Sequence, residues 1–372
     1  MHPQPNATNH PLRTLAIYLP QFHPVPENDE WWGQGFTEWT NVAKARPRFK
    51  GHNQPQLPAD LGFYDLRVPE TRQLQAQLAR QYGIHGFCYY HYWFNGKRIL
   101  ERPFNEVLAS GQPDFPFCLC WANENWTRRW DGRDREVLLK QEYGKQDDLD
   151  HIRALAPAFA DPRYIRVDGK PVFIIYRSEA FPDIRATLDT WREEAMRLGI
   201  GELYLARMES FLRDANPHDM GFDAAIDFQP NLGYHPNRQL GRLDGRILNK
   251  FKIKESSYYH NLVYNYADFA AQMMAKQKTN YKRFPSVTPD WDNSARRKRD
   301  AYILTGSTPK LYEQWLRHTI ENFVPYSPEE NFIFINAWNE WAEGNHLEPD
   351  QRWGRQYLEA TARALNVGNI VL

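Results

Sequence analysis

Residues 69–121 of the chain indicate its fold: PETRQLQAQLARQYGIHGFCYYHYWFNGKRILERPFNEVLASGQPDFPFCLCW. The pattern predicts an amphipathic helix over Pro69–Tyr82 and a short apolar strand over Gly86–Tyr90. The same order then repeats, with a helix over Phe104–Ser110 and a strand over Phe117–Trp121. Short strands that alternate with amphipathic helices are typical of a parallel sheet covered by helices.

This alternation continues on both sides of the quoted stretch. Further strands are predicted at Leu15–Leu19, Val172–Tyr176, Leu203–Arg207, Ala224–Phe228, Pro285–Thr288 and Phe332–Asn336. Further helices are predicted at Asp147–Ala160, Asp183–Leu198, Lys310–Phe323 and Gly354–Leu365. Eight strands in this order predict an α/β protein with a single (β/α)8 TIM barrel and long β→α loops, for which 372 residues are sufficient.

The domain boundaries follow from the same reading. We expect a flexible N-terminal segment over residues 1–13 and one barrel over residues 14–372. An insertion is expected near residues 229–282, with its own helix near Ala267–Lys276. No internal repeat or low-complexity linker indicates a second domain.

Charge and cysteine content exclude several classes of function. Lys plus Arg and Asp plus Glu number 46 each, so no net field favours nucleic acid or an acidic membrane surface. No run approaches the ~20 apolar residues of a membrane span, and Met1–Arg13 lacks the apolar core of a signal peptide. Cys88, Cys118 and Cys120 lie in strand-like runs without metal-ligand spacing, which indicates buried thiols and a cytoplasmic location.

Aromatic residues are abundant, with 13 Trp, 20 Tyr and 21 Phe. Ten tryptophans lie at or just after the ends of predicted strands, where a barrel builds its active face. They are Trp31, Trp32, Trp39, Trp93, Trp121, Trp126, Trp130, Trp291, Trp338 and Trp341. Because sugars stack their C–H faces on indole rings, this distribution predicts an oligo- or polysaccharide substrate.

The segment Asn336–Asp350, which follows the eighth strand, carries the predicted chemistry. Glu340 and Glu343 are three residues apart between tryptophans, so a turn would place both carboxylates on one side. Apolar neighbours would raise one pKa and mutual repulsion would separate the two titrations. Glycoside chemistry needs one protonated and one ionised carboxyl in this arrangement.

This segment and others that follow predicted strands supply candidate substrate-binding residues. They are Glu38, Trp39, Tyr90, His91, Tyr92, Trp93, Trp121, Asn123, Glu124, Trp126, Trp130, Asp290, Asp292, Trp338, Asn339, Trp341 and His346. Asp290-Trp-Asp292 also matches the Asp-x-Asp pair that holds a metal in nucleotide-sugar transferases, but no glycine-rich phosphate loop accompanies it. We therefore predict no metal ion there, and we interpret the basic run Arg296–Arg299 as a solvated face.

Four motifs in order resemble the WbsX family of bacterial surface-polysaccharide gene clusters, which is similar to glycoside hydrolase family 99. They are AIYLPQFHP (16–24), WWGQGFTEWTN (31–41), WANENWTRRW (121–130) and the segment 336–350. The resemblance extends from about residue 14 to the C-terminus. It implies a (β/α)8 barrel and a retaining, endo-acting hydrolase of α-mannosides or related sugars.

The resemblance also implies roles for the two glutamates. The related hydrolases carry the motif Asn-Glu-Trp-His-Glu-Gly, whose catalytic positions fall on Glu340 and Glu343. Glu340 would act as a base on the sugar 2-hydroxyl, and Glu343 as an acid and then a base. Ala342 stands where the hydrolases have histidine, which affects the expected substrate.

Three functions follow from these observations. The first is hydrolysis of an α-linked mannose- or rhamnose-type bacterial polysaccharide, without a cofactor. The second is a glycosyltransferase or transglycosylase of O-antigen or lipopolysaccharide synthesis, with Asp290 and Asp292 as its sequence support. The third is a non-catalytic barrel that binds glycans with the same aromatic face.

Overall fold

A computed structural model describes residues 12–128, 133–211, 213–231, 233, 236, 250 and 260–367. Its main sheet is parallel throughout its central path, in the order β12-β10-β9-β8-β4-β2-β1-β15-β13. The strands are β1 (Arg13–Tyr18), β2 (Gly86–Phe94), β4 (Phe117–Trp121), β8 (Lys170–Ile175), β9 (Tyr204–Met208), β10 (Ala224–Ile226), β12 (Arg283–Phe284), β13 (Ser286–Val287) and β15 (Phe332–Ile335).

The two ends of this sheet meet in one short segment, because β12 and β13 are separated only by Pro285. On one side, β10 and the residue after it donate hydrogen bonds to the carbonyl groups of Lys282 and Phe284. On the other side, β15 and the residue after it donate to those of Pro285 and Val287. Proline cannot donate to a ladder, which accounts for the interruption. The segment closes the ring, and the predicted (β/α)8 barrel is confirmed.

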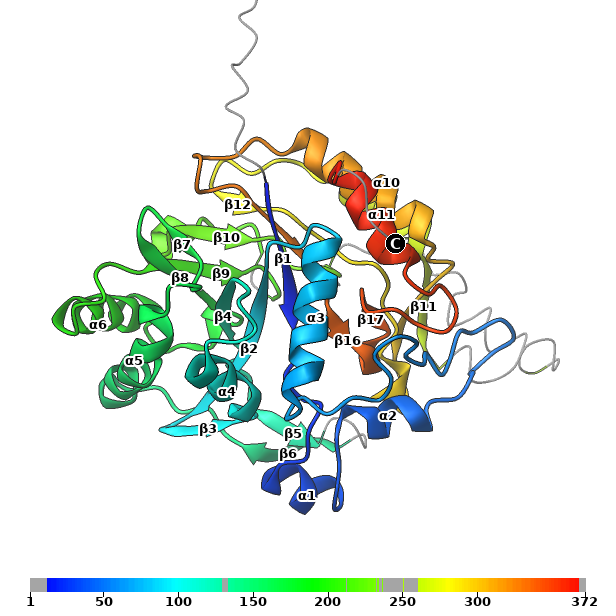
Figure 1. The fold of residues 1–372 in the computed structure, drawn as a ribbon, viewed down its shortest axis with the longest axis horizontal. Helices are drawn as coiled ribbons and strands as arrows, with labels where there is room; N and C mark the ends of the chain where they lie inside the picture. Colours follow the sequence, from blue (N-terminus) through cyan, green and yellow to red (C-terminus); the bar gives the residue numbers. More distant parts are fainter. Residues whose placement is uncertain are drawn as a thin grey trace, which may run out of the picture.

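Helices surround the ring and cover its outer surface (Figure 1). They are α3 (Pro69–Gln81), α4 (Arg102–Ser110), α5 (Lys145–Ala160), α6 (Ile184–Arg197), α9 (Tyr266–Met274), α10 (Pro309–Asn322) and α11 (Gln356–Ala364). Each corresponds to a predicted helix within a few residues, and each predicted barrel strand is likewise present. Among the described residues, no helix is both long enough and apolar enough to cross a membrane.

Smaller elements fill the loops. They are α1 (Pro26–Trp32), α2 (Glu38–Lys44), β3 (Lys97–Ile99), β5 (Trp126–Arg128), β6 (Arg133–Leu139), β7 (Arg166–Val167), β11 (Leu262–Asn265), β14 (Tyr302–Thr305), β16 (Asn339–Glu340) and β17 (Asn345–His346), with short 3-10 turns such as η4 (Asn293–Ala295) and η5 (Trp341–Glu343). Sequence patterns missed them because they are too short to show a period. Residues 1–11 and much of the expected 229–282 insertion lie outside the described residues.

The outer face of the sheet packs against the helices. Tyr18 of β1 donates a hydrogen bond from its hydroxyl to Gln75 of α3, at 2.7 Å. Trp121 at the end of β4 packs against Trp191 of α6, with 5.9 Å between ring centroids. Side chains alternate between the two faces of a strand, so every second residue of these strands belongs to this helix-facing layer.

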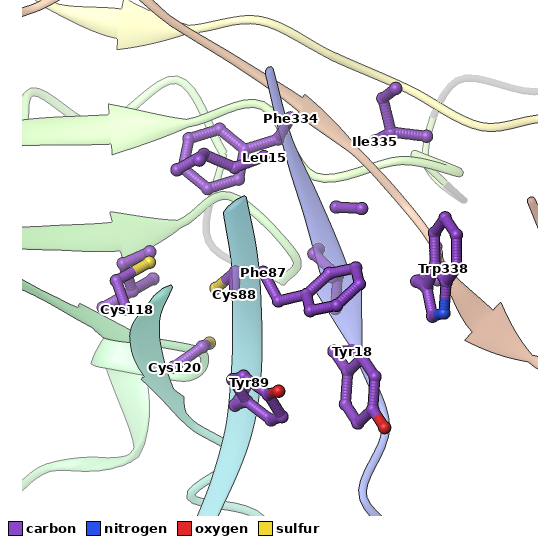
Figure 2. Close-up of a cluster of buried hydrophobic side chains, with 14 of the residues drawn as sticks. Leu15, Tyr18, Phe87, Cys88, Tyr89, Cys118, Cys120, Phe334, Ile335 and Trp338 are labelled. Atoms are coloured by element: carbon purple, nitrogen blue, oxygen red, sulfur yellow. The ribbon is translucent and has the colours of Figure 1, made fainter. Parts of the chain in front are cut away.

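The other residues of the same strands face the interior of the barrel. Cys88 of β2 is paired in register with Cys118 of β4, and Cys120 lies two residues further on the same face. Figure 2 shows the three cysteines close together, on the other side of β2 from the rings of Phe87 and Tyr89. All three thiols are free and buried, as their place in apolar strands predicts.

Candidate active site

A cavity of about 480 Å³ lies at the carboxyl ends of the barrel strands. Its lining comes from residues at or just after the ends of the strands, which are far apart in the sequence but adjacent in the ring. The aromatic part of the lining consists of Trp32, Tyr90, Tyr92, Trp126, Tyr176, Phe211, Phe228 and Trp291. Such walls suit a ligand with apolar faces and polar edges.

Two carboxylates, those of Glu340 and Glu343, line this cavity from the tight turn that follows β15. The turn runs from β16 through η5 to β17, which pairs antiparallel with β16. Gly344 adopts φ +59°, and a Cβ there would lie 2.9 Å from Gln56 Nε2 and 3.0 Å from Cβ of Asp292. Only glycine fits this position, and it fixes the direction in which the turn presents its carboxylates.

Buried hydrogen bonds hold the turn against the barrel. The side-chain amide of Asn339 accepts from the backbone N–H of Leu19 at 2.7 Å and donates to its carbonyl at 3.0 Å. Trp341 donates from its indole N–H to Glu348 at 2.7 Å, and Tyr64 donates to the same carboxylate oxygen at 2.8 Å. These bonds attach the turn to the end of β1 and to the loop before α3.

Arg296 links the two carboxylates to a third one. Its Nη2 lies 3.0 Å from Glu340 Oε2, its Nη1 lies 2.7 Å from Glu343 Oε1, and its Nε lies 2.8 Å from Glu38 Oε1. Only 13% of the Arg296 side chain is exposed. The expectation that Arg296–Arg299 forms a solvated face is therefore wrong for Arg296, which follows η4 and is directed into the site by that turn.

The surroundings of Glu340, Glu343 and Arg296 raise the pKa values of these three groups. Burial raises the pKa of Glu340 to about 8, and the charges of Glu343 and Glu38 act in the same direction, while Arg296 opposes them. Burial likewise raises the pKa of Glu343. For Arg296, burial alone would lower the pKa, but the three glutamates outweigh it and raise the pKa further above its ordinary value. The pair thus holds a proton close to neutral pH.

Alternation along β2 divides the predicted segment Tyr90–Trp93. Tyr90 and Tyr92 line the cavity. His91 and Trp93 point to the other face, where both are buried and both contact His151 of α5. We therefore correct the assignment of His91 and Trp93 as substrate-binding residues, because their side chains do not line the cavity.

The segment after β4 is divided in a similar way. Trp126 and Glu124 line the cavity. Trp121 does not, because it faces the helices and is fully buried, which corrects its assignment as a substrate-binding residue. Asn123 is buried and uses its amide to bind the hydroxyl of Tyr143 and the backbone of Arg177.

Trp130 lies outside the described residues. Several other predicted binding residues pack beneath the turn that carries the glutamates and do not line the cavity. Trp39 and His346 both pack against Trp341, with ring centroids 5.5 Å and 3.7 Å away. Trp338 is fully buried against Phe87 of β2. Together with Asn339, these residues shape the turn, which corrects the expectation that they contact the substrate.

Asp290 and Asp292 line a second, smaller cavity of about 160 Å³, which Gly344 also lines. Asp292 accepts hydrogen bonds from Gln54 at 2.8 Å and from the backbone N–H of Ser294 at 2.9 Å, and lies 2.6 Å from His52 Nε2. These bonds lower its pKa against the effect of burial. The backbone N–H of Asp292 donates to the carbonyl of Glu343 at 2.6 Å, but the Asp290 and Asp292 side chains line a different cavity from those of Glu340 and Glu343.

The sequence did not identify several residues of the cavity. Arg296 lacks any spacing that would connect it to the glutamates, and Tyr176, Phe211 and Phe228 follow strands as single aromatic residues without a motif. Period-two alternation along β2 would have separated Tyr90 from its neighbour His91. For Arg296, no local signal exists, because its partners are more than 40 residues away in the sequence.

Comparisons with known proteins agree with this architecture. The family model described as Glycosyltransferase WbsX matches residues 14–361. The protein WxcX of Xanthomonas campestris pv. campestris (strain B100) is 44% identical over 356 residues, which cover 95% of this chain and 50% of WxcX. The chain thus spans about half the length of the curated relatives that it matches.

Two solved structures share the fold. A glycoside hydrolase-like protein superposes with a TM-score of 0.58 at 16% identity and covers 98% of this chain and 97% of its own. The GH99 endo-α-mannosidase of Bacteroides thetaiotaomicron gives a TM-score of 0.55 at 16% identity and covers 95% and 96%. At these identities the similarity establishes the barrel fold.

Proposed function

The chain belongs to the WbsX family, and on this premise we propose that it is a retaining glycoside hydrolase of an α-linked, mannose- or rhamnose-type bacterial polysaccharide. The proposal rests on one observation, which is the pair of carboxylates Glu340 and Glu343. Both have raised pKa values, both form ion pairs with the guanidinium of Arg296, and both line an aromatic cavity. Acid/base cleavage of a glycosidic bond needs such a pair and needs no cofactor.

The proposed reaction proceeds in two steps. Glu340 takes the proton of the sugar 2-hydroxyl, whose oxygen attacks C1, while Glu343 protonates the departing oxygen and the glycosidic bond breaks. The product is a 1,2-anhydro sugar. Glu343, now a carboxylate, then takes a proton from water, which opens the ring at C1, and Glu340 returns its proton to the 2-oxygen. Two inversions at C1 retain the configuration.

The exposure of the two carboxylates supports these roles. The side chain of Glu343 is 20% exposed and that of Glu340 is 6% exposed, so Glu343 is the more accessible to a leaving group. In the empty site, burial favours the proton on Glu340. The proposed roles therefore require that substrate binding transfers this proton to Glu343, as expected when a hydroxyl group donates to Glu340.

Transfer of a sugar to another sugar is the second candidate, favoured by the name of the family. A transglycosylase would use the same two glutamates, with a sugar hydroxyl in place of water. A metal-dependent nucleotide-sugar transferase has less support here. Asp292 is already bound by His52, Gln54 and Ser294, and it lines the smaller cavity.

The test is incubation of the protein with a panel of α-mannosyl and α-rhamnosyl oligosaccharides, with Glu343→Gln as control. Hydrolysis predicts new reducing ends, of retained configuration when followed by proton NMR. Longer oligosaccharides without net hydrolysis would favour transglycosylation. Tight glycan binding without any bond cleavage, unchanged in Glu343→Gln, would instead support a glycan-binding barrel and contradict the proposal.

A further inference from the structure

Glu38 is a buried carboxylate that does not line the cavity. It begins α2, and its side chain has no exposed surface. One oxygen accepts a hydrogen bond from Arg296 Nε at 2.8 Å, and within the described part of the chain the other has no hydrogen-bond partner. Because α2 packs against both η4 and η5, Glu38 lies directly behind the turn that carries Glu340 and Glu343.

The charges around this position do not balance. Three carboxylates meet the single guanidinium of Arg296, and Arg297 is the other cation that acts on Glu343. Among the described residues, the charges of the cluster also act on Tyr90, Tyr92 and Tyr176, whose pKa values burial raises, so they stay neutral. Glu124, which is paired with Arg177, and Arg213 line the same cavity. Excess buried negative charge is costly, and a proton on one carboxyl relieves it.

We infer that Glu38 is a positioning residue: it serves as a counter-ion of Arg296 and so makes the Glu340–Glu343 pair retain one proton in the empty site. Without Glu38, Arg296 would offer its whole charge to the pair, and both carboxyls would ionise more readily. The catalytic meaning of this role rests on the proposed function, whereas the retained proton does not.

The experiment is a pH titration by 13C NMR of protein labelled at the glutamate δ-carbons, between pH 5 and 9.5. The resonance absent in Glu340→Gln identifies Glu340, which should titrate near 8 in the wild type. In Glu38→Gln this titration should move down by about one pH unit or more, the size expected for loss of an adjacent like charge. An unchanged or higher titration in folded Glu38→Gln would overturn the inference.

Two further variants separate charge from packing. Glu194→Gln removes a remote glutamate that pairs with Arg153 and Arg197, and it should leave the Glu340 titration unchanged. Glu38→Asp retains the charge with less disturbance of the fold, and it should keep the titration within about half a unit of wild type. A downward shift in Glu38→Asp as large as that expected for Glu38→Gln would also contradict the role of charge.

The titration requires no turnover, so its outcome is independent of the proposed function. If the protein cleaves no glycan but Glu38→Gln still lowers the titration, the proposed function fails and the inference stands. If cleavage is found, the basic limb of the kcat/KM profile should move down in Glu38→Gln by the same shift, because that limb reports loss of the essential proton.

Discussion

The cavity lined by Glu340 and Glu343 and the smaller cavity lined by Asp290 and Asp292 each contain closely spaced carboxylates. Burial raises the pKa of Asp290 as it does those of the two glutamates, yet Asp292 behaves in the opposite way. Asp292 receives hydrogen bonds from separate partners, and its pKa is lowered although it is buried. Glu340 and Glu343 share one arginine with a third carboxylate, and their pKa values are raised. The number of donors per carboxylate, and not burial alone, distinguishes a structural acid from one that can exchange protons.

The largest effect is expected when the shared pair is changed. Glu340→Gln and Glu343→Gln should each lower kcat by at least ~10², the lower end for a positioned acid or base. A substrate with a good leaving group should restore the kcat of Glu343→Gln more than that of Glu340→Gln, because such a leaving group needs little protonation. Steady-state kinetics measure both effects. Equal restoration of the two variants would contradict the separate acid and base roles.

A change in the second cavity should affect stability and largely spare turnover. Asp292→Asn removes the negative charge beside His52 and should lower the free energy of unfolding by about 2 kcal/mol at pH 7. The folded pKa of Asp292 lies below its ordinary value of 3.8, so its stabilisation is complete above that pH.

Urea denaturation of Asp292→Asn and wild type across pH measures this difference. The difference between them should shrink as the pH falls below 3.8 toward the folded pKa. A constant difference from pH 7 to pH 2.5, or a kcat reduced as strongly as in Glu343→Gln, would show that the two cavities do not differ as described.

The turn between the glutamates and the smaller cavity's lining is tested by Gly344→Ala. The added methyl group would press on Gln56 and Asp292 in a backbone conformation with φ +59°, so the variant should lose about 1–2 kcal/mol of stability. Turnover should also fall, because η5 would shift. Thermal unfolding of Gly344→Ala beside Gly111→Ala, a positive-φ glycine with open space around it, separates the contact from the backbone strain. Equal losses in the two variants would show that the contact is unimportant.

The smallest effect concerns the aromatic wall. Trp126→Ala should weaken oligosaccharide binding about tenfold, which corresponds to ~1.4 kcal/mol, with little change in stability. Trp121→Phe is the matched change in the helix-facing layer, and it should lower stability and leave binding unchanged. Isothermal titration calorimetry and thermal unfolding measure the two responses. Weaker oligosaccharide binding in Trp121→Phe, together with unchanged binding in Trp126→Ala, would show that Trp121 belongs to the binding surface.

The prediction from sequence succeeded where the signal was repeated along the chain. The eight barrel strands are short apolar runs and the helices around them have an amphipathic period, both imposed by burial, and these elements appear within a few residues of their expected places. It was less successful for side-chain direction. Trp121 and Trp126 share one motif, but Trp121 is the last residue of a strand and faces the helices, while Trp126 lies in a loop hairpin at the cavity.

The sequence alone determined the barrel and the position of the Glu340–Glu343 turn after its last strand, because strand periodicity and the order of elements are local properties of the chain. Only the tertiary structure decided which carboxylates share an arginine. Glu38, Arg296 and Glu340 come from three loops far apart in the sequence, and they meet only because the ring of strands brings its carboxyl ends together. The raised pKa values of Glu340 and Arg296 arise from that meeting, since burial raises the pKa of Glu340 and the glutamate charges raise that of Arg296.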